Sequence, residues 1–196
     1  GHELNNPLFG ILGLGEAIGE EADLDRVRSY ARDIVQHGRR MADIIRDFTG
    51  VTARETSDQR QPVHIERELD RAIATLTDGM DTSKLTIQKM YAGDTCVLAL
   101  PDQLRQAFTN VLMNAVQAMK DQGALRLSTT LTDTSVVTTI ADSGPGIPKQ
   151  HLSKVFDPFF TTKGQGEGSG LGLTVARRII KKFGGDIRIE SQEGNG

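Results

Sequence analysis

The chain has 196 residues, of which 37% are hydrophobic and 25% are charged, and its formal net charge is −3 at pH 7. This length accommodates one or two small domains with a core of their own. The slightly acidic balance gives no general attraction for nucleic acid or for an anionic membrane, so both partners are disfavoured. A single cysteine, Cys96, excludes an internal disulfide framework. No stretch approaches the ~20 apolar residues of a membrane-spanning helix.

Residues 1–53 have the periodicity of two helices joined by a short polar break at 19–23. The second helix carries a seven-residue repeat of apolar or small residues, made of Val27, Ala31, Ile34, Gly38, Met41, Ile45 and Phe48. The first helix carries a similar stripe, made of Leu4, Leu8, Ile11, Gly15 and Ile18. Two helices alone cannot enclose a seam this apolar, so we expect an antiparallel hairpin that pairs with a second copy into a four-helix bundle.

Residues 54–61 are polar and aperiodic and precede Pro62, which predicts a linker. Beyond it, helix and strand patterns alternate. Helices are expected over 65–76, 104–119 and 173–183, and strands over 84–89, 125–131, 136–141 and 187–190. Neighbouring strands with helices gathered elsewhere predict an α+β sandwich with a mixed sheet.

The first chemical motif is HELNNP at residues 2–7. A neutral imidazole is a competent nucleophile near neutral pH, so His2 is a candidate phosphate acceptor. Glu3 would orient the ring or take its proton, and Asn6, one turn further, could position a water near the same site. A solvated His–Glu pair at a helix start remains an equally good interpretation of this hexapeptide alone.

Two further motifs carry polar groups that could meet a nucleotide. Asn110 and Asn114 lie four residues apart on one face of an otherwise apolar helix, where an amide oxygen could bind Mg²⁺. Asp142 opens DSGPGIP at the end of a strand pattern, where a carboxylate could accept a hydrogen bond from an exocyclic amine such as that of adenine. Taken alone, the first motif is also compatible with an ordinary pair of asparagines on a helix, and the second with an ordinary Asp-Gly turn.

The last motif, FDPFFTTKGQGEGSGLGL at 156–173, joins a phenylalanine cluster to five glycines and then a helix. Flexible backbone ending at a helix N-terminus suits phosphate, because free N–H groups and the helix dipole point at the anion. The Walker A pattern is absent. The GxGxxG pattern of dinucleotide-binding sites also fits poorly, because it follows a strand and these glycines follow a phenylalanine-rich turn.

In this order, HELNNP, NxxxN, DxGxG, FxPFFTTK and GxGxGLGL resemble the five signature boxes of sensor histidine kinases of two-component systems, in the nitrogen-regulatory HELNNP subtype. The resemblance covers nearly the whole chain. It implies a dimerisation and histidine-phosphotransfer hairpin at 1–56. At 57–196 it implies an ATP-binding α+β sandwich of the histidine-kinase, gyrase and chaperone type. The family would add one more strand after EGNG, so we expect this domain to lack its last strand.

The resemblance also assigns roles. It implies ATP-dependent autophosphorylation of His2, transfer to an aspartate of a response regulator, and phosphatase activity that uses Asn6, with Glu3 as the acid/base neighbour. Asn114 is the implied Mg²⁺ ligand. The implied ATP-binding residues are Asn110, Asn114, Asp142, Gly144, Gly146, Lys163, Gly168, Gly170, Leu171 and Gly172.

The alternative from the same fold is a gyrase-type or chaperone-type ATPase without histidine transfer. Gyrase-type relatives place a water-activating glutamate one turn before the metal-binding asparagine, and here that position is Asn110, an amide that cannot act as a base. We therefore expect a homodimeric kinase with a response-regulator receiver domain as partner. We expect no nucleic acid or membrane contact by this fragment, and a cytoplasmic location. Gly164 follows FFTTK where relatives often have proline. This difference predicts that the glycine-rich loop which covers the phosphates, called the lid below, is looser than in those relatives.

Overall fold

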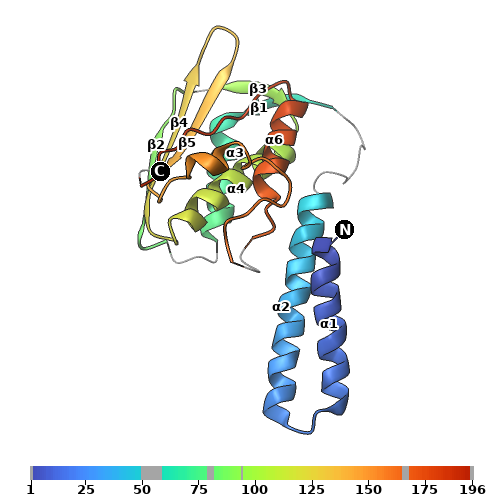
Figure 1. The fold of residues 1–196 in the computed structure, drawn as a ribbon. Helices are drawn as coiled ribbons and strands as arrows, with labels where there is room; N and C mark the ends of the chain where they lie inside the picture. Colours follow the sequence, from blue (N-terminus) through green and yellow to red (C-terminus); the bar gives the residue numbers. More distant parts are fainter. Residues whose placement is uncertain (1, 50–58, 79–81, 94, 165–167, 195–196) are drawn as a thin grey trace. The chain divides into compact units, whose positions relative to one another are not determined.

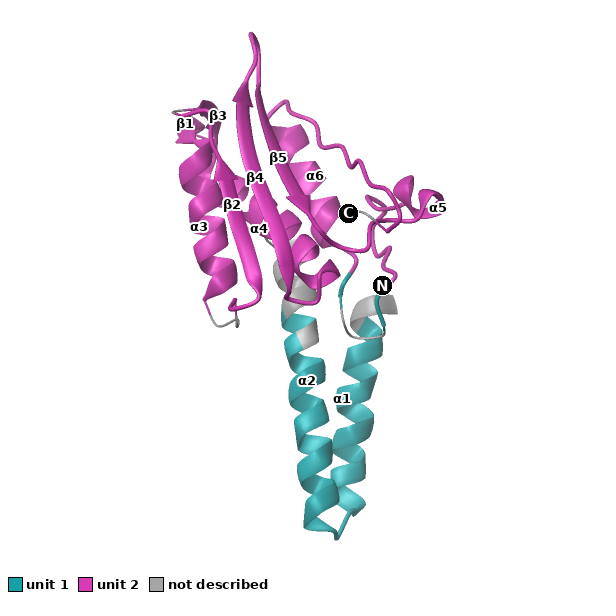
Figure 2. Ribbon diagram, turned by 90° about the vertical axis from the view of Figure 1, so that its left-hand side faces the viewer, with its two compact units in different colours: residues 1–53, 163–169 teal, residues 54–162, 170–196 magenta. Residues whose placement is uncertain are grey.

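The structure is a computed structural model that describes residues 2–49, 59–78, 82–93, 95–164 and 168–194, without the side chains of 2–4, 40 and 43–49. The chain divides into two compact units (Figure 2). One unit comprises residues 1–53 and 163–169, and the other comprises 54–162 and 170–196. In the described parts, no helix is long and apolar enough to cross a membrane.

The first unit contains a helical hairpin in which α1 (His2–Glu20) and α2 (Leu24–Thr49) run side by side (Figure 1). Gly10 permits the helices to approach, since a Cβ at this position would lie 2.7 Å from Nε2 of His37 on α2. His37 therefore belongs to the packing between the two helices. The predicted hairpin is confirmed.

Part of the apolar surface of α1 is not covered by α2. Leu8, Phe9 and Leu12 are 40%, 66% and 54% exposed. Val27, Ile34 and Met41 of the predicted α2 seam are half-buried. Exposed apolar residues at this density, within two helical turns, indicate a surface that contacts another molecule.

The second unit is built on a three-stranded sheet in the order β2 (Leu85–Met90), β4 (Gly123–Leu131) and β5 (Val136–Asp142). β2 is parallel to β4, whereas β5 is antiparallel to it. The central residue Leu127 is fully buried and lies in register with Lys89 on one side and Ile140 on the other. The predicted mixed sheet is confirmed.

Three helices, α3 (Ile65–Thr77), α4 (Pro101–Ala118) and α6 (Gly172–Lys182), cover one face of this sheet (Figure 2). α4 lies between the other two and packs against both. Alternate residues of β4 and the inner faces of α3 and α4 form the core. Its completely or almost completely buried members include Leu69, Leu76, Leu112, Val116, Leu125 and Leu127. The fourth helix of this unit, α5 (Lys149–Leu152), is a single turn.

A short second sheet pairs β1 (Gln61–His64) with β3 (Cys96–Ala99) in antiparallel register. The sequence pattern did not predict it. Next to it, the carboxylate of Glu66 accepts hydrogen bonds from the hydroxyls of Thr95 and Thr129 at 2.6 and 2.9 Å. The Thr129 bond connects the start of α3 to β4, and the Thr95 bond connects it to the residue before β3.

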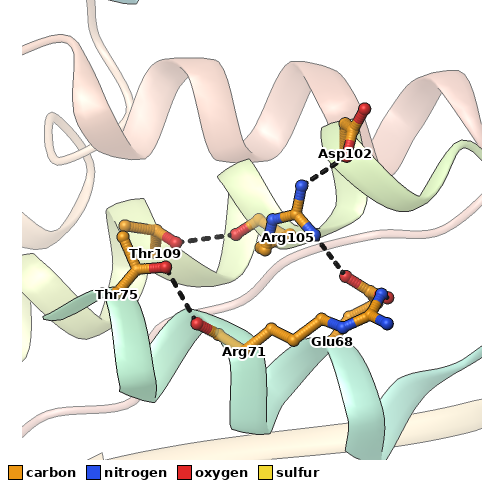
Figure 3. A network of polar contacts seen from close by, with 6 residues as sticks. All are labelled: Glu68, Arg71, Thr75, Asp102, Arg105 and Thr109. Atoms are coloured by element: carbon orange, nitrogen blue, oxygen red, sulfur yellow. Dashed lines mark hydrogen bonds and ion pairs between the residues drawn. The ribbon is translucent and has the colours of Figure 1, made fainter.

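An ion-pair network joins α3 to α4 (Figure 3). The side chain of Glu68 is only 4% exposed, and its two oxygens lie 2.7 Å from Nη1 of Arg71 and 3.3 Å from Nη1 of Arg105. Arg105 also pairs with Asp102 one turn earlier on α4. A buried carboxylate is tolerated here because both of its oxygens are paired with a guanidinium.

The predicted linker and the predicted last strand differ from the structure. Residues 54–58 of the predicted linker lie outside the described residues, and its last residue, Gln61, belongs to β1 instead. Arg60 donates a hydrogen bond to the carbonyl oxygen of Lys182 at 3.2 Å. The strand predicted over 187–190 is wrong. Ile187 and Ile189 are half-buried while Arg188 and Glu190 are exposed, as in a strand, but these residues form no ladder with any described strand. Alternation alone does not make a strand without a neighbour to bond.

Candidate functional site

The end of β5 presents Asp142 to a tight turn. Asp142 is half-buried, lies in register with Leu125 of β4, and accepts a hydrogen bond at Oδ1 from the backbone N–H of Gly144 at 2.9 Å. In the described part of the chain, Oδ2 has no hydrogen-bond partner. The hydroxyl of Ser143 accepts a bond from the N–H of Ala124 at 2.9 Å, which fixes the turn to β4. One carboxylate oxygen thus holds the turn while the other remains available to a ligand.

The two glycines of this turn are required by close contacts. A Cβ at Gly144 would lie 2.6 Å from Oδ1 of Asp142. Gly146 has a φ of +72° and its missing Cβ would collide with the backbone carbonyl of Gln192. Any side chain at either position would displace the Asp142 carboxylate or the segment behind it.

The asparagine-bearing face of α4 meets the start of α6. The Nδ2 of Asn110 donates a hydrogen bond to the carbonyl oxygen of Gly172 at 3.2 Å. Asn114 is half-buried one turn further along α4. Leu171, the residue before α6, is buried, and no side chain among the described residues caps the helix. The first N–H groups of α6 are therefore in position to bind an anion.

The phenylalanine-rich segment is attached to the first half of α6. Gly170 has a φ of +67°, and its carbonyl oxygen accepts a hydrogen bond from the N–H of Phe159 at 3.0 Å. The hydroxyl of Thr174 donates to the carbonyl oxygen of Phe156 at 3.0 Å, and the guanidinium of Arg177 lies 4.7 Å from the centre of the Phe156 ring. These contacts fix the phenylalanine-rich segment to Gly170, at the end of the glycine-rich loop, and to α6.

Thr174 and Arg177 were not identified from the sequence. Their contacts are with residues 18 or more positions away, and a threonine and an arginine on an amphipathic helix carry no motif of their own. Ser191, which contacts the Asp142 turn, was missed for the same reason.

The structure brings only part of the predicted site together. Asn110, Asn114, Asp142, Gly144, Gly146, Gly170, Leu171 and Gly172 belong to the second unit. Lys163 and Gly168 fall in the 163–169 segment, which clusters with the first unit. His2 and Glu3 lie in α1, but their side chains are outside the described residues, whereas Asn6 is described and exposed. Among the described residues, no cluster of three or more His, Cys, Asp or Glu could hold a metal ion.

Comparisons with known proteins identify the class to which this architecture belongs. Residues 99–196 match the histidine kinase-, DNA gyrase B- and HSP90-like ATPase family. Residues 1–56 match the His Kinase A phospho-acceptor domain. A phospho-acceptor hairpin followed by this ATPase domain is the catalytic core of a histidine kinase, and the chain belongs to the sensor histidine kinase family. The predicted resemblance is confirmed.

Similar proteins agree with this assignment. The chain is 29% identical over 198 residues to the sensor histidine kinase ZraS of Escherichia coli K12, covering all of this chain and 42% of ZraS. It is 32% identical over 212 residues to the sensory histidine kinase/phosphatase NtrB of Rhodobacter capsulatus, covering 98% of this chain and 57% of NtrB. The chain thus spans roughly half the length of these relatives.

A solved structure of the same fold covers almost the whole chain. The histidine kinase ThkA, crystallised in complex with the response regulator protein TrrA, superimposes with a TM-score of 0.76. The match covers 99% of this chain and 56% of that one, at 22% identity. This similarity establishes that the order of hairpin and α/β domain is that of a known histidine kinase fold.

Proposed function

We propose that this chain is the kinase core of a two-component sensor, which uses ATP to phosphorylate its own His2 and passes the phosphoryl group to an aspartate of a response regulator. The observation that carries the proposal is the hydrogen bond from Asn110 to Gly172. It joins the asparagine face of α4 to the start of α6, where no described side chain caps the helix and a phosphate can bind the N–H groups. The family match of residues 1–56 supplies the phospho-acceptor that a gyrase-type ATPase lacks.

The nucleotide roles follow from the chemistry of each group. Oδ2 of Asp142 accepts a hydrogen bond from the exocyclic amine of adenine, and Gly144 and Gly146 keep the turn close to the ring. The backbone at Gly170, Leu171 and Gly172 would bind the phosphates near the positive end of the α6 dipole. Lys163 and Gly168 complete the lid as a cation and a flexible backbone position.

Mg²⁺ fits the donor set of α4. The amide oxygen of Asn114 is a hard ligand, and Mg²⁺ ordinarily takes few protein ligands and completes its octahedron with phosphate oxygens and water. When bound, the ion would neutralise charge on the phosphates. The resemblance to histidine kinases favours Asn114 over Asn110 as the ligand, and the family match of residues 99–196 supports that choice.

The transfer itself is an in-line displacement. A ring nitrogen of His2 forms a bond to the γ-phosphorus, and the bond from that phosphorus to the bridging oxygen breaks, so that ADP leaves with the electron pair. The proton on the other ring nitrogen passes to Glu3, which acts as the base. An aspartate oxygen of the regulator then takes the phosphoryl group from His2.

Phosphatase activity is the second part of the proposal. Asn6 lies four residues beyond His2, one turn along α1, and its side chain is exposed. It can orient a water toward an aspartyl phosphate on a docked regulator. The relative NtrB is named a kinase/phosphatase, which favours a dual activity here.

Assembly and location complete the proposal. We place the domain boundary at residues 56 and 57 and two copies of the chain in the functional unit, paired through the hairpins. The exposed Leu8 and Leu12 of α1 would then become core residues of a four-helix bundle. The receiver domain of a response regulator is the transient partner, and the cytoplasm, which supplies ATP, is the location of this fragment.

Incubation with γ-labelled ATP tests the proposal. Wild-type protein is expected to take up label that is lost in acid and retained in base, as a phosphoramidate is. His2→Gln is expected to bind ATP with unchanged affinity and to take up no label, and His151→Gln, at a histidine outside the motifs, is the matched control. Acid-labile label on His2→Gln would contradict the assignment, and ATP hydrolysis without any labelled protein would favour the gyrase-type alternative.

A further inference from the structure

The turn that carries Asp142 is held from behind by residues 191–194. The hydroxyl of Ser191 accepts a hydrogen bond from the backbone N–H of Ile147 at 2.8 Å. Three residues on, the N–H of Gly194 donates to the carbonyl oxygen of Pro145 at 2.7 Å. The two segments therefore run alongside each other over the length of the turn.

Gly146 lies at the centre of this contact. Its φ of +72° and the position of its missing Cβ against the carbonyl of Gln192 leave space for a hydrogen only. The turn and the 191–194 segment are thus in backbone contact, with a hydrogen bond on either side of the closest point. Because Gly146 is in direct contact with the backbone of Gln192, it fixes the distance between the two segments.

Among the described residues, Ser191 supplies the side-chain hydrogen bond of this contact. The N–H of Ile147 lies between two prolines, Pro145 and Pro148, which have no N–H of their own. The N–H of Ile147 is the donor through which the second half of the turn is bound, and the Ser191 hydroxyl receives it. Ile147 is half-buried, so without that acceptor its N–H would have to bind water or leave its present position.

We infer that Ser191 is a positioning residue for nucleotide binding, which keeps the Asp142 turn in its binding-competent conformation. The inference rests on the proposed role of Asp142 at adenine. The turn holds Asp142 through the bond from the Gly144 N–H to Oδ1, so a turn that shifts takes the carboxylate with it. When only a fraction of molecules holds the competent turn, the apparent Kd for the nucleotide rises by the inverse of that fraction.

The expected effect is on affinity rather than on the chemical step. Loss of one backbone-to-hydroxyl hydrogen bond is expected to weaken ATP binding about threefold to tenfold. Once ATP is bound at saturation, its own contacts hold the turn, so the maximal rate of His2 labelling is expected to be unchanged. If Ser191 had a purely structural role, its replacement would instead lower the melting temperature of the nucleotide-free protein. It would also reduce the affinity for ATP and the maximal rate of labelling together.

The experiment compares Ser191→Ala, Ser191→Thr and Ser191→Val in the full chain. Mg²⁺–ATP is titrated to obtain Kd, labelling at increasing ATP gives KM and the maximal rate, and thermal melting is followed without nucleotide. Ala and Val are expected to raise Kd and KM together, and Thr, which keeps the hydroxyl, to restore both. Ser128→Ala is the matched control, because Ser128 is half-buried on β4 and its side chain takes part in no described hydrogen bond.

Each possible result either supports or overturns the role of Ser191 in nucleotide binding. An unchanged Kd in Ser191→Ala overturns the inference, as does a Thr variant that is no better than Val, since the hydroxyl would then be irrelevant. If Ala fails to fold, the Thr and Val pair carries the same comparison. Wild-type protein that binds no ATP overturns the proposed function itself, whereas wild-type binding with an unaffected Ser191→Ala overturns only the role of Ser191.

Discussion

The side-chain amide of Asn110 lies 3.2 Å from the carbonyl oxygen of Gly172 and joins the middle of α4 to the first residue of α6. The two residues are 62 positions apart in the sequence. Gly172 packs directly on Asn110, because a Cβ on the glycine would lie 3.8 Å from the Cβ of the asparagine. The end of the glycine-rich loop is thus fixed to the helix that carries the proposed Mg²⁺ ligand.

Replacing Asn110 by alanine is expected to weaken ATP binding about fivefold or more, because the start of α6 loses its connection to α4. Asn110→Asp is expected to be at least as damaging, since a carboxylate cannot donate to the Gly172 carbonyl and would face it with like partial charge. Titration with Mg²⁺–ATP measures the Kd of both Asn110 variants. Gln106→Ala, one turn earlier on α4 and equally half-buried, is the control. Equal Kd values for Asn110→Ala and wild type would contradict this role.

Local pattern was enough to predict α3, α4 and the three strands of the main sheet, because each has a run of apolar residues at one period. It was not enough for β1 and β3, whose four residues each are too short to alternate visibly. The motifs indicated the loops in which we expect the chemistry to take place. They could not predict that Ser191 reaches Ile147, 44 positions away, or that Thr174 holds the Phe156 carbonyl. Such contacts depend on tertiary packing, which one sequence does not display.

The buried carboxylate of Glu68 makes the α3–α4 interface sensitive to loss of its partners (Figure 3). Arg105→Ala is expected to lower the free energy of unfolding by about 2 kcal/mol, since Glu68 stays buried with only the more exposed Arg71 beside it. Urea denaturation measures this difference. Arg28→Ala, which removes a fully exposed pair with Asp25, is expected to cost under about 0.5 kcal/mol. Equal losses for the two variants would mean that burial of Glu68 contributes nothing to the interface.

Glu66 predicts how stability responds to acid. Burial raises the pKa of Glu66, but the hydrogen bonds from Thr95, from the Glu66 backbone and from Thr129 together outweigh burial and hold the pKa below its ordinary value. A lowered folded pKa gives stability that is present above the unfolded pKa of about 4.3 and is lost as the pH falls through the folded pKa. Thr95→Val removes the 2.6 Å bond and is expected to cost about 1 to 2 kcal/mol at pH 7.

The difference in free energy of unfolding between Thr95→Val and wild type is expected to shrink from pH 5 downward. Protonation of Glu66 removes the charge that the hydrogen bond from the Thr95 hydroxyl stabilises. Urea denaturation at a series of pH values between 7 and 3 measures it. Thr130→Val, on the exposed side of the same strand as Thr129, is expected to show a difference that does not change with pH. A Thr95→Val difference that is constant across this range would show that the charge on Glu66 is not involved.

Phe9 predicts where the response regulator contacts α1. It lies seven residues beyond His2, which is two helical turns along the same side of α1, and it is 66% exposed. A receiver domain that presents its aspartate to His2 would cover this ring. Phe9→Ala is therefore expected to slow phosphoryl transfer from labelled His2 to the regulator about tenfold, at sub-saturating regulator.

Autophosphorylation of His2 and the dimer mass in sedimentation are expected to be unchanged in Phe9→Ala, because the proposed bundle core uses Leu8 and Leu12 instead. Leu24→Ala, which truncates an equally exposed residue at the start of α2, is the matched control for loss of surface apolar area. If Phe9→Ala dissociates the dimer, then Phe9 belongs to the seam between the two copies. If transfer stays at the wild-type rate, then the regulator approaches His2 from another side of the helix, and the exposure of Phe9 has a different cause.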